Sequence, residues 1–183
     1  MADETLLEVL DSLRERGAHG EVSLTNAVGH AEAFLAAFPS GVRRVVDLGS
    51  GGGLPGLVLA VRRPDLSFTL VDRRERRMDL LRLAVARLRL TDRVEVVTAD
   101  VVRLAADEAY AGLFDVVTAR SFGAPMVTAS CARPFLADGG VVIISEPPAS
   151  AARDRWNDAG LTALRLARSP QSFPHVQRLD LVS

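Results

Sequence analysis

The spacing of hydrophobic residues changes at about residue 42, from a helical repeat to short apolar runs. Before that point, four leucines with charged residues between them recur at helical spacing: Leu6, Leu7, Leu10 and Leu13. Gly17 is suited to end this first helix. A second helix is predicted from a cap at Thr25 or Asn26 to Phe38. Residues 1–40 are therefore expected to form a short helical extension.

From residue 42 onwards, short apolar runs alternate with segments of helical periodicity. The runs predict seven strands, at Val45–Leu48, Ser67–Val71, Val94–Thr98, Phe114–Thr118, Val141–Ser145, Leu161–Ala167 and Val176–Val182. The segments between them predict helices at Pro55–Arg63, Glu75–Leu90, Val101–Glu108, Pro125–Leu136 (which Pro134 would end or kink) and Ala149–Ala159. A turn is expected at Gly139-Gly140.

This alternation indicates an α/β fold of the Rossmann-like type. The first five strands are separated by segments long enough for crossover helices, so they should be parallel and buried. The last two strands lack such a helix between them and should pair antiparallel. The length of 183 residues fits a single domain over 1–183, with residues 42–183 as its catalytic core.

Composition narrows the functional classes. The net charge is −1, so the overall charge favours neither a nucleic-acid nor a membrane partner, although every basic side chain is arginine. The single cysteine, Cys131, excludes a disulfide within the chain and is expected to be a small buried hydrophobe. No apolar run is long enough to span a membrane, and the acidic start does not resemble a signal peptide. We expect a cytoplasmic protein, monomeric by default.

The first candidate for ligand chemistry is the loop from Asp47 to Gly53, where a strand meets a helix. Its glycines, at 49, 51, 52 and 53, allow backbone angles that other residues avoid and let a ligand lie on the main chain. Open parallel sheets bind ligands at the carboxyl ends of their strands, where this loop falls. Ser50 lies within the loop. We expect Asp47 to accept hydrogen bonds from a cationic group such as the ammonium of a methionine moiety.

Two more acids end the next two strands. Asp72 is placed to accept both hydroxyls of a ribose, and Arg73 follows it directly. Asp100, with a backbone N–H of the following Val101 and Val102, is placed to bind the edge of an adenine. A strand-end Asp alone is commonly a turn former or a helix cap. The joint placement of three such acids with the glycine loop indicates S-adenosylmethionine, and with it the class I methyltransferase form of the Rossmann-like fold.

A dinucleotide is the main alternative cofactor. Gly51-x-Gly53-x-x-Gly56 fits the dinucleotide pattern, with Asp72 about 20 residues downstream. Against it, Asp47 places a charge in a strand that would normally stay apolar. Pro55 also lies within the segment whose N–H groups should cradle a pyrophosphate, and proline has none. No metal site is expected, because the three histidines lack ligand spacing.

The sequence from Val45 to Asp65, above all Gly53-Leu54-Pro55-Gly56, closely resembles the cofactor loop of the GidB-type bacterial small-subunit rRNA guanine-N7 methyltransferases. The similarity extends over about residues 22 to 145 and includes Arg77, Leu80-Leu81 and the segment ending in Arg120-Ser-Phe. The resemblance implies that Gly49, Leu54, Val101, Val102 and Arg120 line the cofactor pocket. It also implies a guanine of ribosomal RNA as methyl acceptor, with ribosomal RNA or the small ribosomal subunit as partner.

Two departures from this family bear on the acceptor. The family usually has a Lys-Gly pair after the fifth strand, where this chain has Ser145-Glu146, and a carboxylate would repel an RNA phosphate. The basic N-terminal region of the family is acidic here. A small-molecule methyltransferase and a non-catalytic cofactor-binding protein therefore stay open as alternatives. No general base is evident, and Arg120 is the candidate for a positioning role.

Overall fold

The computed structural model of the protein describes residues 2–18, 23–147 and 155–182. Its strands are β1 (Arg44–Leu48), β2 (Ser67–Asp72), β3 (Val94–Thr98), β4 (Phe114–Ala119), β5 (Leu136–Ser145), β6 (Leu166–Arg168) and β7 (Val176–Leu181). Its helices are α1 (Ala2–Glu15), α2 (Leu24–Leu35), α3 (Gly56–Arg62), α4 (Glu75–Arg87), α5 (Val101–Leu104), α6 (Pro125–Ala132), the short 3-10 helix η1 (Arg133–Phe135) and α7 (Asp158–Ala163).

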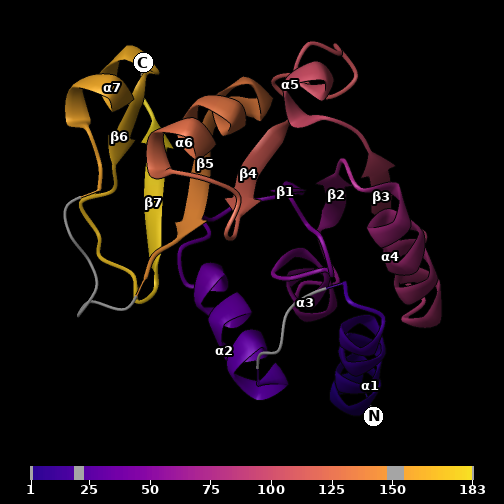
Figure 1. Cartoon of the computed structure of the whole chain (residues 1–183). Helices are drawn as coiled ribbons and strands as arrows, with labels where there is room; N and C mark the ends of the chain where they lie inside the picture. The colour runs from indigo at the N-terminus through magenta and orange to yellow at the C-terminus, as the bar shows by residue number, and fades with distance from the viewer. Residues whose placement is uncertain (1, 19–22, 148–154, 183) are drawn as a thin grey trace.

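The strands form one sheet in the order β3-β2-β1-β4-β5-β7-β6 (Figure 1). Each neighbouring pair from β3 to β5 is parallel, whereas β7 is antiparallel to both β5 and β6. The predicted mostly parallel, seven-stranded sheet with an antiparallel last strand is confirmed. Because the chain order reverses between β1 and β4, a crevice is expected at the carboxyl ends of these two strands.

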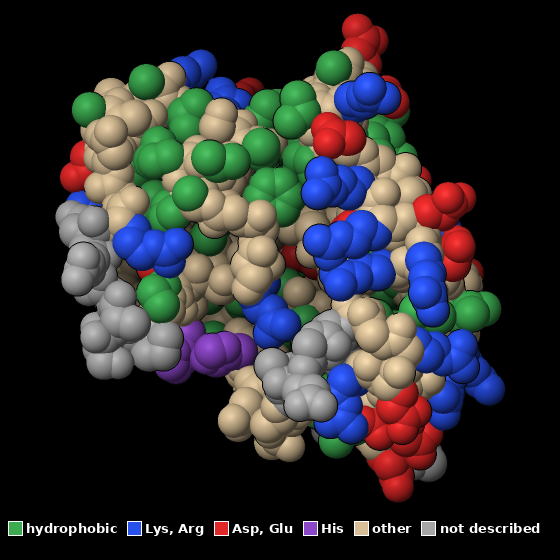
Figure 2. Space-filling model, viewed as in Figure 1, with side chains coloured by type: hydrophobic (Ala, Val, Ile, Leu, Met, Phe, Trp, Pro, Cys, Tyr) green, Lys and Arg blue, Asp and Glu red, His purple; other side chains and the backbone are tan. Residues whose placement is uncertain are grey.

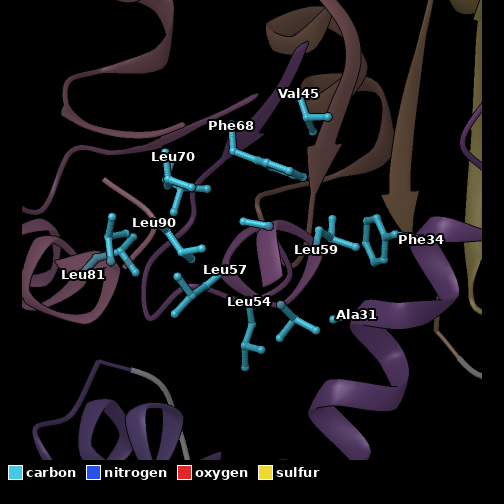
Figure 3. Packing of buried hydrophobic residues seen from close by; sticks show 14 of the residues in the cluster. Ala31, Phe34, Val45, Leu54, Leu57, Leu59, Phe68, Leu70, Leu81 and Leu90 are labelled. Carbon is cyan, nitrogen blue, oxygen red and sulfur yellow. The ribbon is translucent and has the colours of Figure 1, made fainter. Parts of the chain in front are cut away.

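Apolar side chains on the two faces of the sheet belong to two separate clusters. Alternating residues of β1 show the division, since Val45 packs into one cluster and Val46 into the other. Helices α1 to α4 cover the first face, and α5, α6 and α7 cover the second (Figure 1). Figure 3 shows the first cluster, where Leu57 and Leu59 of α3 pack among Phe68 and Leu70 of β2. Burial on both faces explains why apolar residues occupy successive positions in β1 and β2.

The predicted helical extension packs against the first face of the sheet. Helix α1 contributes Leu6 and Leu10, which are 1% and 0% exposed, and α2 contributes the fully buried Ala31 and the nearly buried Phe34. Burial of a side chain the size of Phe34 contributes about 1.5–3 kcal/mol to folding. Gly17, at φ +73°, follows α1 as predicted. The extension is therefore part of the main core.

The second helix begins and ends earlier than predicted. Its N-cap is Ser23, whose hydroxyl accepts a hydrogen bond from the Asn26 amide, so neither Thr25 nor Asn26 is the cap. The helix ends at Leu35, before Phe38. Serine is as good a cap as asparagine, and helix ends are commonly displaced by a residue or two.

The Gly139-Gly140 pair is not a separate turn, because it lies inside β5. Gly139 has φ +74°, and a Cβ on Gly140 would be 2.9 Å from the carbonyl oxygen of Ala137. The register between β4 and β5 shifts at this point, between the pairs made by Phe114 and Val116. The glycines therefore form a bulge in a continuous strand.

The structure of the segment before the last strand also differs from the prediction. The predicted strand over Leu161–Ala167 is wrong, since residues 158–163 form α7 and only Leu166–Arg168 are extended. Asn157 caps α7 through a bond from the Gly160 amide. The predicted helix at 149–159 falls largely on 148–154, which lie outside the described residues. The apolar spacing of this segment suggested a strand, but the Asn157 cap favours a helix, and the helix forms.

Many arginines of the described chain are ion-paired. Eight form salt bridges with Asp or Glu side chains: Arg14, Arg62, Arg63, Arg82, Arg87, Arg155, Arg168 and Arg178. Most of these pairs are partly exposed, so each contributes little to stability. Within the described residues, no helix is both long and apolar enough to cross a membrane.

Candidate functional site

A cavity of about 450 Å³ opens at the carboxyl ends of the central strands. Ten of the predicted site residues line it: Gly49, Ser50, Gly51, Leu54, Asp72, Arg73, Asp100, Val101, Val102 and Arg120. Two predicted residues, Asp47 and Gly53, do not. The parallel register of β3, β2, β1 and β4 brings these residues together, because it aligns the ends of the four strands on one edge.

The loop after β1 is fastened to β2 by hydrogen bonds. The amides of Gly49 and Ser50 both donate to the Val71 carbonyl, at 2.8 and 2.9 Å. The Ser50 hydroxyl donates to the Asp47 carbonyl and accepts from the Val71 amide, at 2.8 and 3.1 Å. Ser50 is almost fully buried. Its hydroxyl therefore fixes the loop, in addition to contributing to the cavity wall.

Gly49 allows a close approach between the loop and an aromatic ring. A Cβ at Gly49 would lie 2.8 Å from Cδ2 of Phe122, and its φ of +72° is unfavourable for residues with side chains. Ser121, which precedes Phe122, has φ +52°. Such a backbone conformation costs of order 1–3 kcal/mol and clusters at binding sites. The loop at Gly49 and the Phe122 ring therefore lie too close together for any side chain between them.

Asp47 differs from its predicted role. Its carboxylate is fully buried beneath the loop, where it accepts from the Thr118 hydroxyl at 2.7 Å and from the Gly56 amide at 3.2 Å. Burial raises the pKa of Asp47 from 3.8 to about 6, against the lowering effect of these bonds and of the Arg120 charge. Asp47 therefore holds α3 and β4 to β1, and does not line the described cavity.

Gly53 also has a packing role. A Cβ there would lie 2.9 Å from Leu57 Cβ and 3.0 Å from Leu81 Cδ1, so the glycine lets the loop pack onto α3 and α4. Gly56 is tighter still, since a Cβ would be 2.5 Å from Leu70 Cδ2 and 2.7 Å from an oxygen of Asp47. The glycine spacing that suggests a dinucleotide site is thus satisfied in part by helix packing.

Asp72 is buried at the floor of the cavity. One carboxylate oxygen accepts from the Gly51 amide at 3.1 Å, and the other accepts from the Arg74 amide at 2.9 Å. A carboxylate has about four acceptor positions, so these two bonds leave capacity for a ligand hydroxyl. The Asp72 side chain therefore orients the loop and remains available to the cavity.

Asp100 is exposed at the cavity edge and caps α5. Its carboxylate accepts from the amides of Val102 and Arg103, at 3.0 and 3.3 Å. Val101 is buried, whereas Val102 is 67% exposed. The backbone N–H of Val102 is occupied by the cap, so the carboxylate and the apolar surface of Val102 are the groups left for a ligand.

Arg120 follows β4 and is partly buried in the cavity wall. Burial lowers the pKa of its guanidinium, whereas the neighbouring Asp47 raises it. The net direction is downward, although arginine stays charged at any physiological pH. Arg120 therefore brings a positive charge to the part of the cavity nearest the buried Asp47.

Gly52 of the predicted loop also lines the cavity. Several other residues that line it were not predicted: Ala18, Arg74, Arg77, Ala99, Phe122 and Cys131. Arg74 and Arg77 follow Asp72 closely, so their sequence position was a usable signal. Phe122 directly follows the predicted Arg120-Ser121. The sequence around Ala18 did not indicate a binding site, because only the packing of the N-terminal extension brings this residue to the cavity.

Cys131 and Trp156 are both partly buried. Cys131 is only partly buried and lines the cavity, so its predicted role as a fully buried hydrophobe is wrong; burial raises its thiol pKa. Trp156 donates from Nε1 to a Glu146 oxygen at 2.8 Å and does not line the cavity. Within the described ranges, no group of three or more His, Cys, Asp or Glu residues could hold a metal ion.

Comparison with known proteins identifies similar chains. The model of the GidB family, described as rRNA small subunit methyltransferase G, matches residues 24–163. A protein named ribosomal RNA small subunit methyltransferase G from Acidiphilium cryptum is 36% identical over 149 residues, which is 73% of this chain and 65% of that protein. The namesake from Leifsonia xyli is 41% identical over 109 residues, covering 59% of this chain and 49% of its own length. The chain thus spans about half to two thirds of these relatives.

Solved structures show a similar fold. An O-methyltransferase from Bacillus cereus, determined in complex with SAH, has a TM-score of 0.67 at 18% identity and covers 98% of this chain and 91% of that one. An O-methyltransferase family protein from Burkholderia thailandensis has a TM-score of 0.66 at 19% identity and covers 87% of this chain and 56% of that one. At such low identity the likeness concerns the fold alone, and it confirms the predicted Rossmann-like, class I arrangement.

Proposed function

This chain belongs to the rRNA small subunit methyltransferase G family, and we propose that it is an S-adenosylmethionine-dependent methyltransferase acting on N7 of a guanine in small-subunit ribosomal RNA. The observation that supports this most is that the matched residues, 24–163, include nearly all of the residues around the cavity. The acceptor atom is the finer part of the proposal and derives from the family resemblance of the glycine loop.

The cavity fits the proposed cofactor. Its volume of about 450 Å³ lies within the usual range for small-molecule sites, about 300–1,000 Å³. A Cβ on Gly51 would project toward the cavity, 3.5 Å from Nη1 of Arg77 and 3.8 Å from an oxygen of Asp72. A glycine therefore keeps this part of the floor open. A dinucleotide is less suitable, because Pro55 removes an N–H from the loop.

The residue roles follow from the groups that the cavity presents. Asp72 would accept the hydroxyls of the ribose, and Asp100 with the apolar surface of Val102 would bind the adenine. The loop at Gly49 and Gly51 would lie along the methionine part. When bound, S-adenosylmethionine supplies an electrophilic methyl group on a sulfonium sulfur.

The chain would then act by positioning the acceptor and excluding water. Guanine N7 has a free lone pair in the neutral base, so attack at this atom requires no general base. Phe122 lies beside Gly49 and Arg120 lines the same cavity, where the two side chains would limit the approach of the acceptor. Holding two reactants in line replaces a bimolecular encounter and can supply several kcal/mol of barrier reduction.

The decisive experiment is transfer of labelled methyl groups from S-adenosylmethionine to purified small ribosomal subunits that lack the modification. We expect incorporation at one guanine, with the label recovered in 7-methylguanine when the bases are released and separated. Incorporation only into small molecules would favour the alternative acceptor class, and tight cofactor binding without any transfer would indicate a non-catalytic protein.

Two variants separate cofactor binding from transfer. Asp72→Ala should weaken binding of S-adenosylhomocysteine, measured by calorimetry, because it removes the buried acceptor. Arg120→Ala should lower turnover, cofactor affinity or both; unchanged values for both would refute the positioning role of Arg120. Arg63→Gln is a suitable control, since Arg63 pairs with Asp65 outside the cavity.

A further inference from the structure

The arginines that line the cofactor cavity differ in their partners from the ion-paired arginines elsewhere in the described chain. The eight ion-paired arginines described above all have Asp or Glu partners, and none of them lines the cofactor cavity. The arginines that do line the cavity are Arg73, Arg74, Arg77 and Arg120, and none of these four forms an ion pair with a described residue.

Three of these four come from one short segment between β2 and the first turn of α4. Arg73 and Arg74 are exposed, and Arg77 is half-buried beside Gly51. Arg76, on the same turn, is exposed and makes no ion pair with a described residue either. We call Arg73, Arg74, Arg76 and Arg77 the arginine edge. Figure 2 shows basic side chains gathered over α4 beside the central hollow, whereas the surface over α6 is largely hydrophobic.

The proposed cofactor does not account for this charge. S-adenosylmethionine carries a sulfonium and an ammonium against one carboxylate, so a cluster of guanidinium groups repels its net positive charge. Among the described residues that line the cavity, the acids are Asp72 and Asp100, and the Asp72 carboxylate already accepts from two backbone amides. Unpaired cations of one sign beside a cleft attract a polyanion over several ångströms.

The opposite side of the site is unsuitable for phosphate. After β5, Glu146 accepts from Trp156 at 2.8 Å and pairs with Arg155 at 3.6 Å. The Glu146 carboxylate therefore offsets the charge of Arg155, so the described residues place more unpaired positive charge at the arginine edge than beside Glu146. This difference in charge between the two sides favours approach of a polyanionic acceptor from the arginine edge.

We propose that the arginine edge is the surface that holds the phosphate backbone of the acceptor RNA, so that the strand crosses α4 and the end of β2 and not the end of β5. This rests on the proposed function, and it names the residues and the side from which the acceptor enters. Arg guanidinium groups bind phosphate oxygens through paired N–H donors, which suits exposed side chains without other partners.

The test compares two double variants that remove the same charge. Arg73→Gln with Arg74→Gln removes two members of the edge, and Arg63→Gln with Arg168→Gln removes two ion-paired arginines outside the cavity. Binding to in vitro transcribed small-subunit ribosomal RNA is measured at several salt concentrations, and S-adenosylhomocysteine binding is measured by calorimetry in parallel.

We expect the edge variant to lose at least tenfold in RNA affinity at low salt and to show a shallower salt dependence. Each lost phosphate contact should reduce the slope of log K against log salt by about 0.7–0.9. The control should match the wild type in RNA affinity, salt dependence and cofactor affinity. Because Arg73 and Arg74 line the cofactor cavity, RNA binding is compared in the absence of cofactor, so that a change in cofactor affinity of the edge variant does not enter the comparison.

Equal RNA affinity and slope for the edge variant and the control would overturn the inference while the proposed function stands. A loss of slope in Arg155→Gln, with none in the edge variant, would also overturn it by placing the RNA at the end of β5. If the wild type binds no RNA and transfers no methyl group to subunits, both proposals fail together.

Discussion

The buried Asp47 carboxylate should make the stability of the protein depend on pH in an unusual direction. Its folded pKa is raised to about 6, above the ordinary 3.8 expected in the unfolded chain. Below pH 3.8 the group is protonated in both states, and it does not penalise folding. As pH rises toward 6, the unfolded chain releases the proton first, so stability falls.

The magnitude follows from the pKa difference. A rise from 3.8 to about 6, at about 1.4 kcal/mol for each pH unit, makes ionised Asp47 cost about 3 kcal/mol at neutral pH. Asp47→Asn removes this ionisation with little change of shape. Its amide oxygen can accept from Gly56, and its NH₂ can donate to Thr118, whose hydroxyl lies 3.5 Å from the Val46 carbonyl and can donate there.

Urea denaturation followed by circular dichroism, at pH values from 4 to 7.5, would measure the difference between the wild type and Asp47→Asn. We expect the wild type to lose about 3 kcal/mol relative to the variant across this range. Parallel stability curves would refute the assignment of a raised pKa to Asp47.

A second variant tests the electrostatic cause. The Arg120 charge lowers the pKa of Asp47, so Arg120→Gln should raise that pKa further and increase the loss of stability toward neutral pH. The same substitution in the Asp47→Asn background should have no such pH dependence. A pH-dependent effect of Arg120→Gln in both backgrounds would show that another titrating group is responsible.

Two further predictions concern the cavity wall and its edge. Gly49→Ala should destabilise the fold by about 2–4 kcal/mol, because φ is positive at this position and the new Cβ overlaps the Phe122 ring. Adding Phe122→Ala should relieve the overlap but not the cost of the positive φ. A double-mutant cycle measured by thermal denaturation would separate the two contributions. Asp100→Ala should lower the stability by about 1 kcal/mol, because it removes the cap bonds from the Val102 and Arg103 amides, and it should weaken S-adenosylhomocysteine binding. Asp100→Asn should keep most of the stability. A cofactor affinity of Asp100→Ala equal to that of the wild type would exclude Asp100 from the binding site.

The sequence alone determined the order of strands and helices in the core and most of the cavity residues. Strand and helix periods are local properties, and parallel strands separated by helices must place their carboxyl ends on one edge. The loop from Gly49 to Leu54 and the acids Asp72 and Asp100 were therefore predictable as one site. The misassigned segments, at residues 139–140 and 161–167, are places where a bulge or a capping side chain competes with the apolar pattern.

The tertiary structure decided which way each side chain faces and what it contacts. Asp47 sits at a strand end like Asp72, yet its carboxylate is directed beneath the loop, because Thr118 on the neighbouring strand and the Gly56 amide satisfy it there. Ala18 reaches the cavity only through packing of the N-terminal helices. The separation of paired from unpaired arginines is equally a tertiary property, since an ion pair depends on distances between residues that may be far apart in the chain, such as Arg87 and Glu8.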